Sequence, residues 1–529
     1  MIKKVIKYIL WIFIMLVVVK GLFFSGNAHL PANNQVFRKA EAGFVWAKAG
    51  AQYARSKIGE FFLGQHYRAV WAVPVKVPVI DINQMYGGLI PGKLGGGMQT
   101  TSLNLKDKQN NTYVLRSLNK DPVGVLPPFW RRTIAADLIR DQIAAANPYA
   151  ALVVAPLAEA AGIFHTNPRI FFVSAADKNF RPVVKQTGNK LFLFEEKFSQ
   201  LPPPPHQFGS ATAILNSVEM LDNRFRFNSH FIDQKLFLRC RLFDILIGDW
   251  DRHEGQWNWA AYLTDAGILY KPIPKDRDQA FSKYQDGLIP WLLTRNFSLR
   301  KFGQFDNHPQ DAVVYTINAS FLDERALNAL TQHDFSKAAQ ELKAVLTDDV
   351  IDRAVKQFPP PVYRLVGAET ARILKNRRNQ LKQIADAYYQ ITAKHVVVAG
   401  SDERERFEIT RLPAGKTQVR IFALTESNTR SRLMYQRVFT AAQTKEITVH
   451  GLGGDDVFVV QGQVATGSII RIVGGRGADH IQDNATVTQE TGKTMVYDTK
   501  KGNNIIWGKG TVDNTSSDLS VHQYDREGF

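Results

Sequence analysis

The sequence predicts an α+β domain followed by an all-β domain, with a short apolar segment at the N-terminus. Extended and helical hydrophobic patterns alternate from residue 71 to about residue 395. From residue 396 to 529, short apolar stretches alternate with turns rich in Gly, Asn and Asp, which is typical of β-structure. Strands and helices that occupy separate runs of a chain favour α+β architecture. The 529 residues and the 45% hydrophobic content are enough for several buried cores.

The first 28 residues are expected to form a signal peptide or a retained membrane anchor. Basic residues precede an apolar run over residues 8–19, and small residues follow near Ser25. A basic start, an apolar core of about 7–15 residues and a small-residue exit are typical of a secretory signal. A spanning helix needs about 20 apolar residues, a length reached here only by burying Lys20. Both interpretations predict an exported protein of the periplasm or the membrane-associated cell envelope.

Composition narrows the expected partners. The formal net charge of +17 favours anionic partners such as lipid headgroups, nucleotides or phosphorylated glycans. The sequence has no basic run interleaved with aromatic residues and no zinc-finger spacing, so nucleic acid is not an expected partner. Cys240 is the only cysteine, which excludes an internal disulfide, and its apolar neighbours predict a buried residue.

The expected secondary structure changes near residue 71, where the spacing of the apolar residues changes. Residues 34–70 are expected to be helical, because their apolar residues recur at near-helical spacing. Prolines within residues 71–82 predict an extended segment, since proline is excluded from a helix interior. Residues 101–118 are expected to form a hairpin that turns at residues 109–112.

Helices and strands then alternate up to the all-β domain. Residues 163–197 are expected to contain several short strands, and the prolines at 202–205 predict a stiff connector. Three segments are expected to be mainly helical: residues 133–146, capped by Thr133, a stretch that ends near residue 247, and residues 320–393.

Two acidic clusters are the most informative features of the sequence. Asp251 and Gln256 follow an apolar run, and Asp276 and Asp278 follow a second one. The intervening residues 257–270 are expected to form a hairpin, which would bring the two clusters together. Asp251 could accept a proton from an attacking hydroxyl, and the other three residues could offer oxygen atoms to Mg²⁺ or Mn²⁺. In the alternative, structural interpretation, Arg252 pairs with the nearby Asp249.

Cationic residues upstream could complete a phosphate site. Arg116 and Lys120 are separated by an even number of residues, so in an extended strand both would project to one face. They could hold phosphate oxygens, or they could be a solvated strand end. Asp137 and Asp141 share one face of a predicted helix, and either could pair with the strand cation or remain on the surface.

A glycine run precedes these cations. Gly95, Gly96 and Gly97 join a possible strand to a polar segment. Glycines let backbone amides approach phosphate oxygens closely, although most glycine runs are flexible turns. Both interpretations therefore remain open for this run.

The order of these motifs resembles the atypical kinase-like fold. In pattern they are similar to HipA-type kinases, the spore-coat kinase CotH and the secretory-pathway kinases. The resemblance implies a two-lobed kinase-like domain over residues 71–395 that binds ATP with Mg²⁺ or Mn²⁺. The roles that it implies are a base at Asp251, metal ligands at Gln256 and at Asp278 or Asp276, a strand cation at Arg116 or Lys120, and nucleotide contacts from Gly95, Gly96, Gly97, Glu195 and Glu196.

Several longer sequence segments resemble those of a family of Bacteroidota envelope proteins. They lie at residues 95–100, 115–122, 248–254 and 272–281, and the resemblance covers about residues 40–529. Members of that family often carry a calcineurin-like phosphoesterase domain before this region and a BamA/TamA-type outer-membrane barrel after it. The resemblance therefore implies the outer membrane or a barrel protein as a partner.

The C-terminal domain, residues 396–529, contains two glycine- and aspartate-rich turns. Residues 451–458 and 474–481 resemble the calcium turns of RTX repeats, which implies Ca²⁺ at Asp455, Asp456 or Asp479. The alternative is that these residues form glycine-rich β-turns without bound metal. A true calcium-binding β-roll would need more repeats in tandem than the two seen here.

Taken together, the motifs predict an exported envelope protein with an atypical kinase-like domain. Its reaction would be metal-dependent phosphoryl transfer from a nucleotide to a protein, glycan or lipid hydroxyl. The main alternative is a catalytically inactive kinase-fold scaffold or binding module in outer-membrane assembly. A phosphate-binding hydrolase is a third hypothesis.

Overall fold

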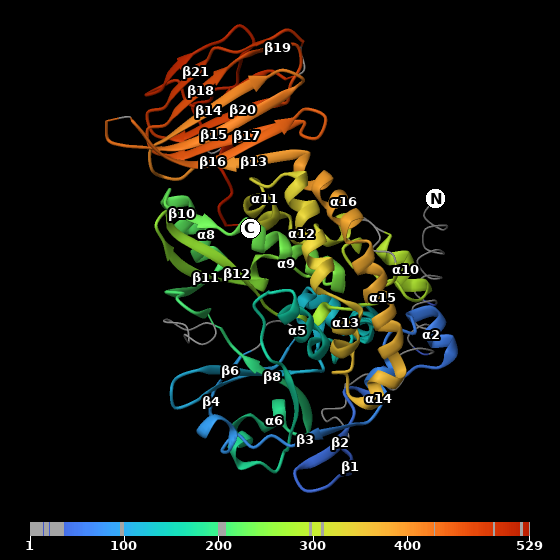
Figure 1. Ribbon diagram of the computed structural model, residues 1–529. Coiled ribbons are helices and arrows are strands. Elements are labelled where there is room, and N and C mark those ends of the chain that lie inside the picture. The colour runs from blue at the N-terminus through green and yellow to red at the C-terminus, as the bar shows by residue number, and fades with distance from the viewer. Residues whose placement is uncertain are drawn as a thin grey trace.

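The computed structural model describes Ile14, Gly21 and residues 36–95, 100–198, 208–295, 299–307, 312–427, 429–489, 492–518 and 522–527. It contains a small-sheet region, a helical body and a β-domain, which follow one another along the molecule (Figure 1). The expected signal or anchor lies outside the described residues apart from Ile14 and Gly21, and so do the prolines at 202–205.

The described helices were also tested for the ability to cross a membrane. None of them is long and apolar enough by itself. One pair, Ile134–Ala145 with Ala150–Ala160, passes the test of length and composition together, although it is bent by 48°.

The N-terminal segment forms strands before it forms helices. An antiparallel three-stranded sheet is made of β1 (Val36–Lys39), β2 (Phe44–Ala47) and β3 (Val75–Pro78), with the short helices α2 (Lys57–Leu63) and α3 (Arg68–Ala72) between β2 and β3. The expectation of a helical segment over residues 34–70 was therefore wrong for its first part. Gly43, at φ 81°, turns the chain between β1 and β2, and burial in β2 alternates with the period of a strand.

A second sheet of five antiparallel strands lies at the end of the molecule opposite the β-domain (Figure 1). In spatial order its strands are β4 (Ile90–Gly95), β5 (Ser102–Lys106), β6 (Thr112–Ser117), β8 (Lys190–Glu196) and β7 (Arg169–Val173). The β5–β6 hairpin matches the expectation, and Asn110, at φ 65°, lies in its turn. Between β7 and β8 the chain forms the short α6 (Val184–Thr187) and a preceding 3₁₀ turn.

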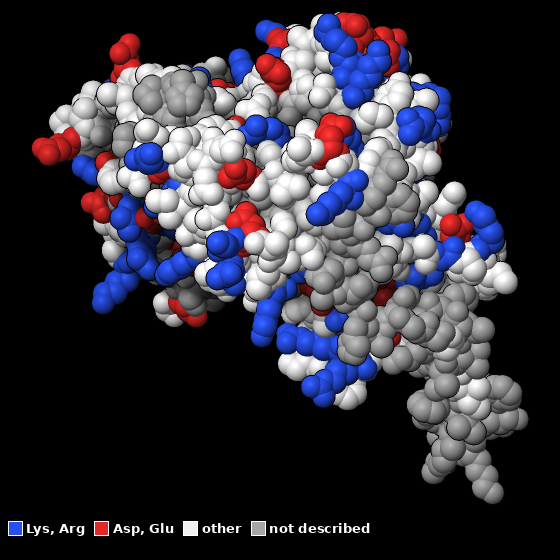
Figure 2. All heavy atoms as spheres, turned by 90° about the horizontal axis from the view of Figure 1, so that it is seen from below, with Lys and Arg blue, Asp and Glu red and all other residues white. Residues whose placement is uncertain are grey.

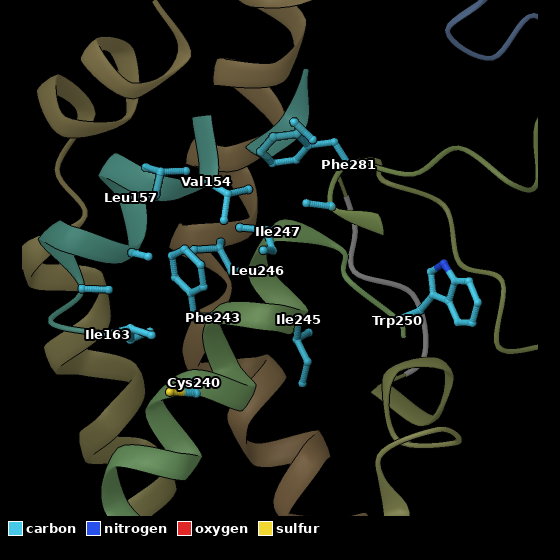
Figure 3. Close-up of a cluster of buried hydrophobic side chains, with 14 of the residues drawn as sticks. Val154, Leu157, Ile163, Cys240, Phe243, Ile245, Leu246, Ile247, Trp250 and Phe281 are labelled. Atoms are coloured by element: carbon cyan, nitrogen blue, oxygen red, sulfur yellow. The ribbon is translucent and has the colours of Figure 1, made fainter. Parts of the chain in front are cut away.

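The helical body is built around α9 (Gln234–Ile247), in which every residue from Cys240 to Ile247 is buried. The charged residues Arg241 and Asp244 are therefore buried together with the apolar ones. Cys240, Phe243 and Leu246 of α9 lie among the side chains of Val154 and Leu157 from α5 (Ala150–Ala160) (Figure 3). Cys240 is buried as expected, and burial raises the pKa of its thiol to about 12.

The helical body contains further helices, some of which pack against α9 (Figure 1). They are α4 (Ile134–Asp141), α8 (Ser217–Arg226), α10 (Leu288–Thr294), α11 (Ser320–Ala326), α12 (Gln332–Val345), α13 (Asp348–Val355), α14 (Pro360–Val362), α15 (Ala368–Asn379) and α16 (Leu381–Ala393). Thr133 caps α4 as expected, because its side chain accepts a hydrogen bond from the amide of Ala135 at 3.3 Å.

One edge of the body is a four-stranded sheet. Its strands, in spatial order, are β10 (His230–Ile232), β12 (Gly267–Pro274), β11 (Trp257–Thr264) and β9 (Ala213–Asn216). The antiparallel hairpin of β11 and β12 turns between Thr264 and Gly267, as the sequence predicts. This hairpin is important for the candidate site, because the two acidic clusters lie at its open end.

The C-terminal domain, from His395 to Asp513, is a parallel β-solenoid. One sheet is wholly parallel and consists of β13 (His395–Ala399), β17 (Glu446–Gly453), β20 (Ile469–Arg476), β23 (Thr494–Tyr497) and β25 (Val512–Asp513). The facing sheet has the order β16 (Arg430–Thr440), β15 (Lys416–Leu424), β14 (Glu405–Leu412), β18 (Val457–Gln461), β21 (His480–Asp483) and β24 (Asn504–Ile506). The short strands β19 (Gln463–Val464) and β22 (Thr486–Val487) pair at one side.

The expectation of an all-β domain is therefore confirmed, and the register shows how the strands stack. Glu446 pairs with Ile469 and Val457 pairs with His480, so these two rungs of the solenoid are offset by 23 residues. The next rung, in which Ile470 pairs with Thr494, is offset by 24 residues. The two glycine-rich turns, residues 451–454 and 474–477, are one rung apart and form the same corner of the solenoid. Their glycines are thus required by the repeat of the fold.

Candidate functional site

The structure brings the two predicted acidic turns, residues 249–256 and 276–278, into direct contact. The amide of Lys275 donates a hydrogen bond to the carbonyl of Gln256 at 2.9 Å, at the open end of the β11–β12 hairpin. Arg252 then joins the two turns, because its guanidinium donates to the carbonyl oxygens of Lys275 at 2.7 Å and of Gln256 at 3.1 Å. The short β11–β12 hairpin therefore brings the two acidic turns together, as the sequence predicts.

Arg252 is a structural residue of this loop. Its side chain is fully buried and its guanidinium is within 3.2 Å of Asp244 and 3.5 Å of Asp249. It also lies over the ring of Trp257, 4.6 Å from the centroid. The structural interpretation, in which Arg252 pairs with Asp249, is thus found in the structure, and it leaves Asp251 free of that pairing.

Asp244 on α9 stabilises the loop through ion pairs, a role that the sequence patterns did not predict. Its carboxylate lies 3.0 Å from Arg277 and 3.3 Å from Arg241, in addition to Arg252. Arg241 is held in turn by Asp323 at 2.8 Å. The signal was present in the sequence, because an acid within the apolar run of α9 must be buried and must therefore have partners.

Asp251, like Glu254 in the same loop, is a carboxylate that reaches the surface. It is partly exposed, and its Oδ1 accepts a hydrogen bond from the side-chain amide of Asn318 at 3.0 Å. Its own backbone amide donates to Asp249 at 3.2 Å. Asp249 is fully buried, and burial raises its pKa to about 8 against the opposing charge of Arg252.

The predicted cations meet the second turn. Arg116 on β6 pairs with Glu195 on β8 at 3.0 Å and with Asp276 at 2.8 Å. Lys120 lies beyond the end of β6, and its ammonium pairs with Asp278. These contacts place the site where the five-stranded sheet meets the helical body. Burial raises the pKa of Glu195, while the charge of Arg116 opposes that shift.

The sequence left open whether Asp137 or Asp141 on the helix pairs with the strand cation, which the structure shows to be Arg116. Asp141 is buried and pairs with Arg68 at 2.6 Å and with Arg55 at 2.7 Å. Within the described part of the chain, the acids that contact Arg116 come from β8 and from the turn after β12, and Asp137 is not one of them. Of the two alternatives that the sequence left open, pairing of a helix acid with the strand cation is therefore not found among the described residues, because β8, rather than α4, runs directly beside β6.

The other residues predicted to contact a nucleotide are not part of this ion-pair network. The carboxylate of Glu196 accepts hydrogen bonds from the backbone and side-chain amides of Asn167, at 2.7 Å and 3.1 Å. Gly95 is the last residue of β4. Gly96 and Gly97 lie outside the described residues, so a phosphate contact from the glycine run stays a prediction.

Tyr284 shows that the two acidic turns share one electrostatic environment. Burial raises the pKa of this phenol, and the charges of Asp278 and Asp251 raise it further. Its hydroxyl donates a hydrogen bond to the side chain of Gln279 at 2.9 Å. The expected base and the expected metal ligand therefore act on the same neighbouring side chain.

The side chains near the Asp276 turn bear on the predicted metal site. No group of three or more His, Cys, Asp or Glu side chains in the described ranges is arranged to hold a metal ion. The buried Oε1 of Gln256 accepts no hydrogen bond from any residue that the structure describes. Asp276 has a backbone φ of 49°, in the left-handed region that Asp and Asn adopt more readily than most other residues with a side chain.

The residues predicted to bind calcium lie at the solenoid corner. Asp456 and Asp479 are buried, and each accepts a hydrogen bond from the amide of the residue one rung before it, Glu405 at 2.8 Å and Asp456 at 2.9 Å. Asp455 is exposed and accepts from the amide of Ala478 at 2.8 Å. Calcium binding there stays a prediction.

Comparison with known proteins found similarities among solved structures and no match among family models or curated proteins. No protein-family model and no curated protein matches the chain. Among solved structures, a proinflammatory kinase from Helicobacter pylori, CtkA, is similar to 59% of this chain over 98% of its own length. The identity is 16% and the TM-score is 0.35, values too low to establish a common fold.

Proposed function

We propose that this chain is an exported, kinase-like phosphotransferase of the cell envelope, which transfers a phosphoryl group from a nucleotide to a protein, glycan or lipid hydroxyl. One observation carries the proposal: Arg116 and Lys120 pair with Asp276 and Asp278 directly beside the loop that bears Asp251. Phosphoryl transfer needs cations for the phosphates, oxygen ligands for a metal and a base for the acceptor hydroxyl. The N-terminal sequence pattern supports export.

The residues present fit a divalent metal bound with a nucleotide. Asp276, Asp278 and Gln256 offer oxygen atoms, which Mg²⁺ and Mn²⁺ prefer as ligands. The side-chain oxygen of Gln256 is buried and has no donor among the described residues, which supports a ligand at that atom. When bound, the metal would neutralise charge on the phosphates.

The ion pairs describe how the cations would bind the phosphates. In the structure Lys120 neutralises Asp278, so a metal and a phosphate that enter together can replace both halves of the pair. Arg116 contacts two carboxylates with different nitrogen atoms of its guanidinium. A planar guanidinium can keep one of these contacts and donate its other hydrogen bonds to a phosphate oxygen.

Asp251 is the residue we propose as the general base. The amide of Asn318 and the backbone of the loop orient its carboxylate, which is partly exposed. It would accept the proton of the acceptor hydroxyl as that oxygen attacks the phosphorus atom. Asp249 lies beneath it, fully buried, and supports the loop through its contacts with Arg252 and with the amide of Asp251.

Nucleotide binding is tested by thermal unfolding of the full chain with ATP and Mn²⁺. A ligand that binds only the folded state raises its melting temperature, and a concentration of about 100 times Kd stabilises by about 2.7 kcal/mol. We expect a rise for the native protein and for the control Asp265→Asn, which alters an exposed residue of the β11–β12 turn. The rise should be lost in Asp278→Asn. The absence of a rise in the native protein would contradict the proposal.

Transfer is tested separately with γ-labelled ATP and an envelope extract as the source of acceptors. Asp251→Asn is expected to reduce labelling by about 10²-fold or more, because a general base is lost, while the rise in melting temperature is retained. Nucleotide binding without labelling by the native protein would favour the inactive kinase-fold scaffold. The double pairing of Arg116, which ties up the strand cation, is the observation that favours that second hypothesis.

A further inference from the structure

Two short helices that are distant in the sequence, α2 and α10, are joined at a pair of glycines. A side chain at Gly287 would come within 2.2 Å of the backbone nitrogen of Gly64, so only glycine permits this approach. Both glycines have left-handed φ angles, 94° for Gly64 and 91° for Gly287. Next to them, the carboxylate of Asp286 accepts a hydrogen bond from the amide of His66 at 2.6 Å. The two helices therefore have a fixed relative position.

The helices α2 and α10 lie next to each other at the edge of the helical body (Figure 1). Together they expose a set of large apolar side chains. On α2, Ile58 is 68% exposed and Phe61 is 64% exposed. On α10, Trp291 is 42%, Leu292 55% and Leu293 48% exposed. We call these five residues, with Leu288, the α2–α10 surface. Soluble proteins rarely leave clustered apolar side chains of this size in water without a partner.

The spacing of these residues explains why they are exposed. Ile58 and Phe61 are three residues apart on α2, so they share one face of that helix. Leu288, Trp291 and Leu292 share a face of α10 for the same reason. Each helix turns other residues inward: Gly59 and Leu63 are buried on α2, and Pro290 and Thr294 are buried on α10.

Basic side chains surround the surface. The guanidinium of Arg295, at the end of α10, lies 4.2 Å from the ring centroid of Trp291. Lys57 is largely exposed on α2, and the exposed Arg300 follows shortly after α10. The nearby acids are engaged, because Glu60 pairs with Lys57 at 2.8 Å and Asp286 accepts from a backbone amide. Lys57, Arg295 and Arg300 against Glu60 and Asp286 leave a net charge of +1 on these five residues, which has the same sign as the net charge of +17.

The same bias is visible more widely on the molecule. On the face shown in Figure 2, Lys and Arg side chains are more widespread than Asp and Glu side chains. They lie among uncharged side chains and do not form one continuous basic patch. Such a surface attracts an anionic sheet of lipid headgroups over a broad area, and binding of this kind weakens as salt screens the charges.

We infer that the α2–α10 surface docks this protein on an anionic lipid bilayer. Helices that lie in a membrane interface combine Trp, Phe and Leu on one side with Lys and Arg beside them. The exposed apolar residues would enter the boundary between headgroups and acyl chains, while Lys57 and Arg295 would contact anionic headgroups. The chain continues from the Asp278 turn into α10, so docking would also orient the candidate site relative to the bilayer. The inference does not require that site to be active.

The test uses the full chain with a single reporter on the surface. Leu292→Cys is labelled with an environment-sensitive fluorophore, and the buried Cys240 does not react. The matched control is Leu263→Cys, which is 74% exposed near the tip of the β11–β12 hairpin. Because each label reports its own position, binding through residues 1–28 does not produce a signal at residue 292 by itself.

Phosphatidylglycerol-containing vesicles are expected to shift the emission of the label at position 292 to shorter wavelength. Quenchers placed in the acyl region should reduce that emission, and the label at position 263 should not respond. In unlabelled protein, Leu292→Asp combined with Phe61→Asp is expected to weaken vesicle binding about tenfold or more. Both positions are exposed, so the melting temperature of this variant should stay close to that of the native protein.

Four outcomes would overturn the inference. The label at position 292 could be shielded before vesicles are added, which would show that another part of the chain covers the surface. A signal that depends on protein concentration would indicate a second copy. Equal responses at positions 292 and 263 would indicate non-specific adsorption. Equal responses to anionic and to purely phosphatidylcholine vesicles would remove the role of charge.

Discussion

The helical body and the solenoid both bury several carboxylates, but they compensate them in different ways. Around α9 the acids face guanidinium groups, as Asp244 does with Arg241, Arg252 and Arg277. In the solenoid Asp456 and Asp479 occupy equivalent places in successive rungs, with Glu405 and Asp498 beside them, and we call these four acids the carboxyl ladder. The carboxyl ladder is held mainly by backbone amides and by neighbouring carboxyls.

The ladder follows from the repeat of the solenoid. Asp456 Oδ1 accepts from the amide of Glu405, Asp479 Oδ1 from that of Asp456, and Asn503 Oδ1 from that of Asp479, all at 2.8–2.9 Å. Glycines at the same corner leave room for the carboxyls. A side chain at Gly474 would come within 2.5 Å of Asp479 Oδ2 and 2.1 Å of Asp498 Oδ2.

The pKa values show how strongly burial acts on these acids. Burial is the main cause that raises the pKa of Asp479 to about 7 and that of Asp498 to about 6, and neighbouring carboxyls raise the pKa of Asp479 further. Glu405 is raised to about 7 by burial, although Arg224 opposes the shift. Asp249 and Asp323 of the helical body behave similarly, because burial outweighs the charges of Arg252 and Arg241. The pKa of Asp249 is raised to about 8, and that of Asp323 is raised as well.

The largest expected effect comes from removing the acid that holds the cations of the body. Asp244→Asn leaves the buried guanidiniums of Arg241, Arg252 and Arg277 without a shared charge, and removal of one partner of a buried ion pair costs about 3–5 kcal/mol. Urea unfolding followed by tryptophan fluorescence measures the loss, because Trp257 and Trp259 lie in the body.

The control for this variant is Asp265→Asn, an exposed acid that is expected to change stability by no more than about 0.5 kcal/mol. A loss of less than about 1 kcal/mol in unfolding free energy for Asp244→Asn would show that the buried guanidiniums of the body do not depend on this carboxylate. The contrast between the body and the solenoid would then be lost.

The second prediction concerns pH. The carboxyl ladder has pKa values above those of an unfolded chain, so its protons stabilise the folded solenoid at low pH, and this stability is lost as the pH rises through about 6–7. We expect the solenoid to be less stable by about 2 kcal/mol or more at about pH 8 than at about pH 5. Hydrogen exchange of β18 and β21 amides, corrected for the intrinsic pH dependence, measures the difference. A solenoid that is more stable at the higher pH would contradict this account.

The third and smallest prediction replaces one rung of the ladder. Asp479→Asn introduces the residue type that the next rung already carries as Asn503, where it accepts a similar hydrogen bond. We expect this variant to be more stable than the native solenoid by about 1–2 kcal/mol at about pH 8 and to lose part of the pH dependence. The exposed Asp455→Asn serves as the control for the loss of an acid at this corner. Destabilisation of Asp479→Asn at about pH 8 would show that the ladder needs a charge at this rung.

The elements that follow from local patterns were predicted from the sequence. The β5–β6 and β11–β12 hairpins, the cap at Thr133 and the change to β-structure at His395 depend on neighbouring residues, which the sequence displays directly. Within the expected helical segment over residues 320–393, the break between α15 and α16 was not predicted, because no proline or glycine marks Gln380. The strands β1 and β2 were missed for a similar reason: short apolar runs fit both helix and strand spacing.

The candidate site divides in the same way. The meeting of the Asp251 loop with the Asp276 turn could be predicted, because a short hairpin joins them in the chain. The pairing of Lys120 with Asp278 spans 158 residues, and that of Arg116 with Glu195 depends on which strand runs beside β6. The sequence by itself determined the residue types and the local turns. Only the tertiary structure decided which acid faces which cation, because packing selects the partner of a buried charge among many that are chemically equivalent.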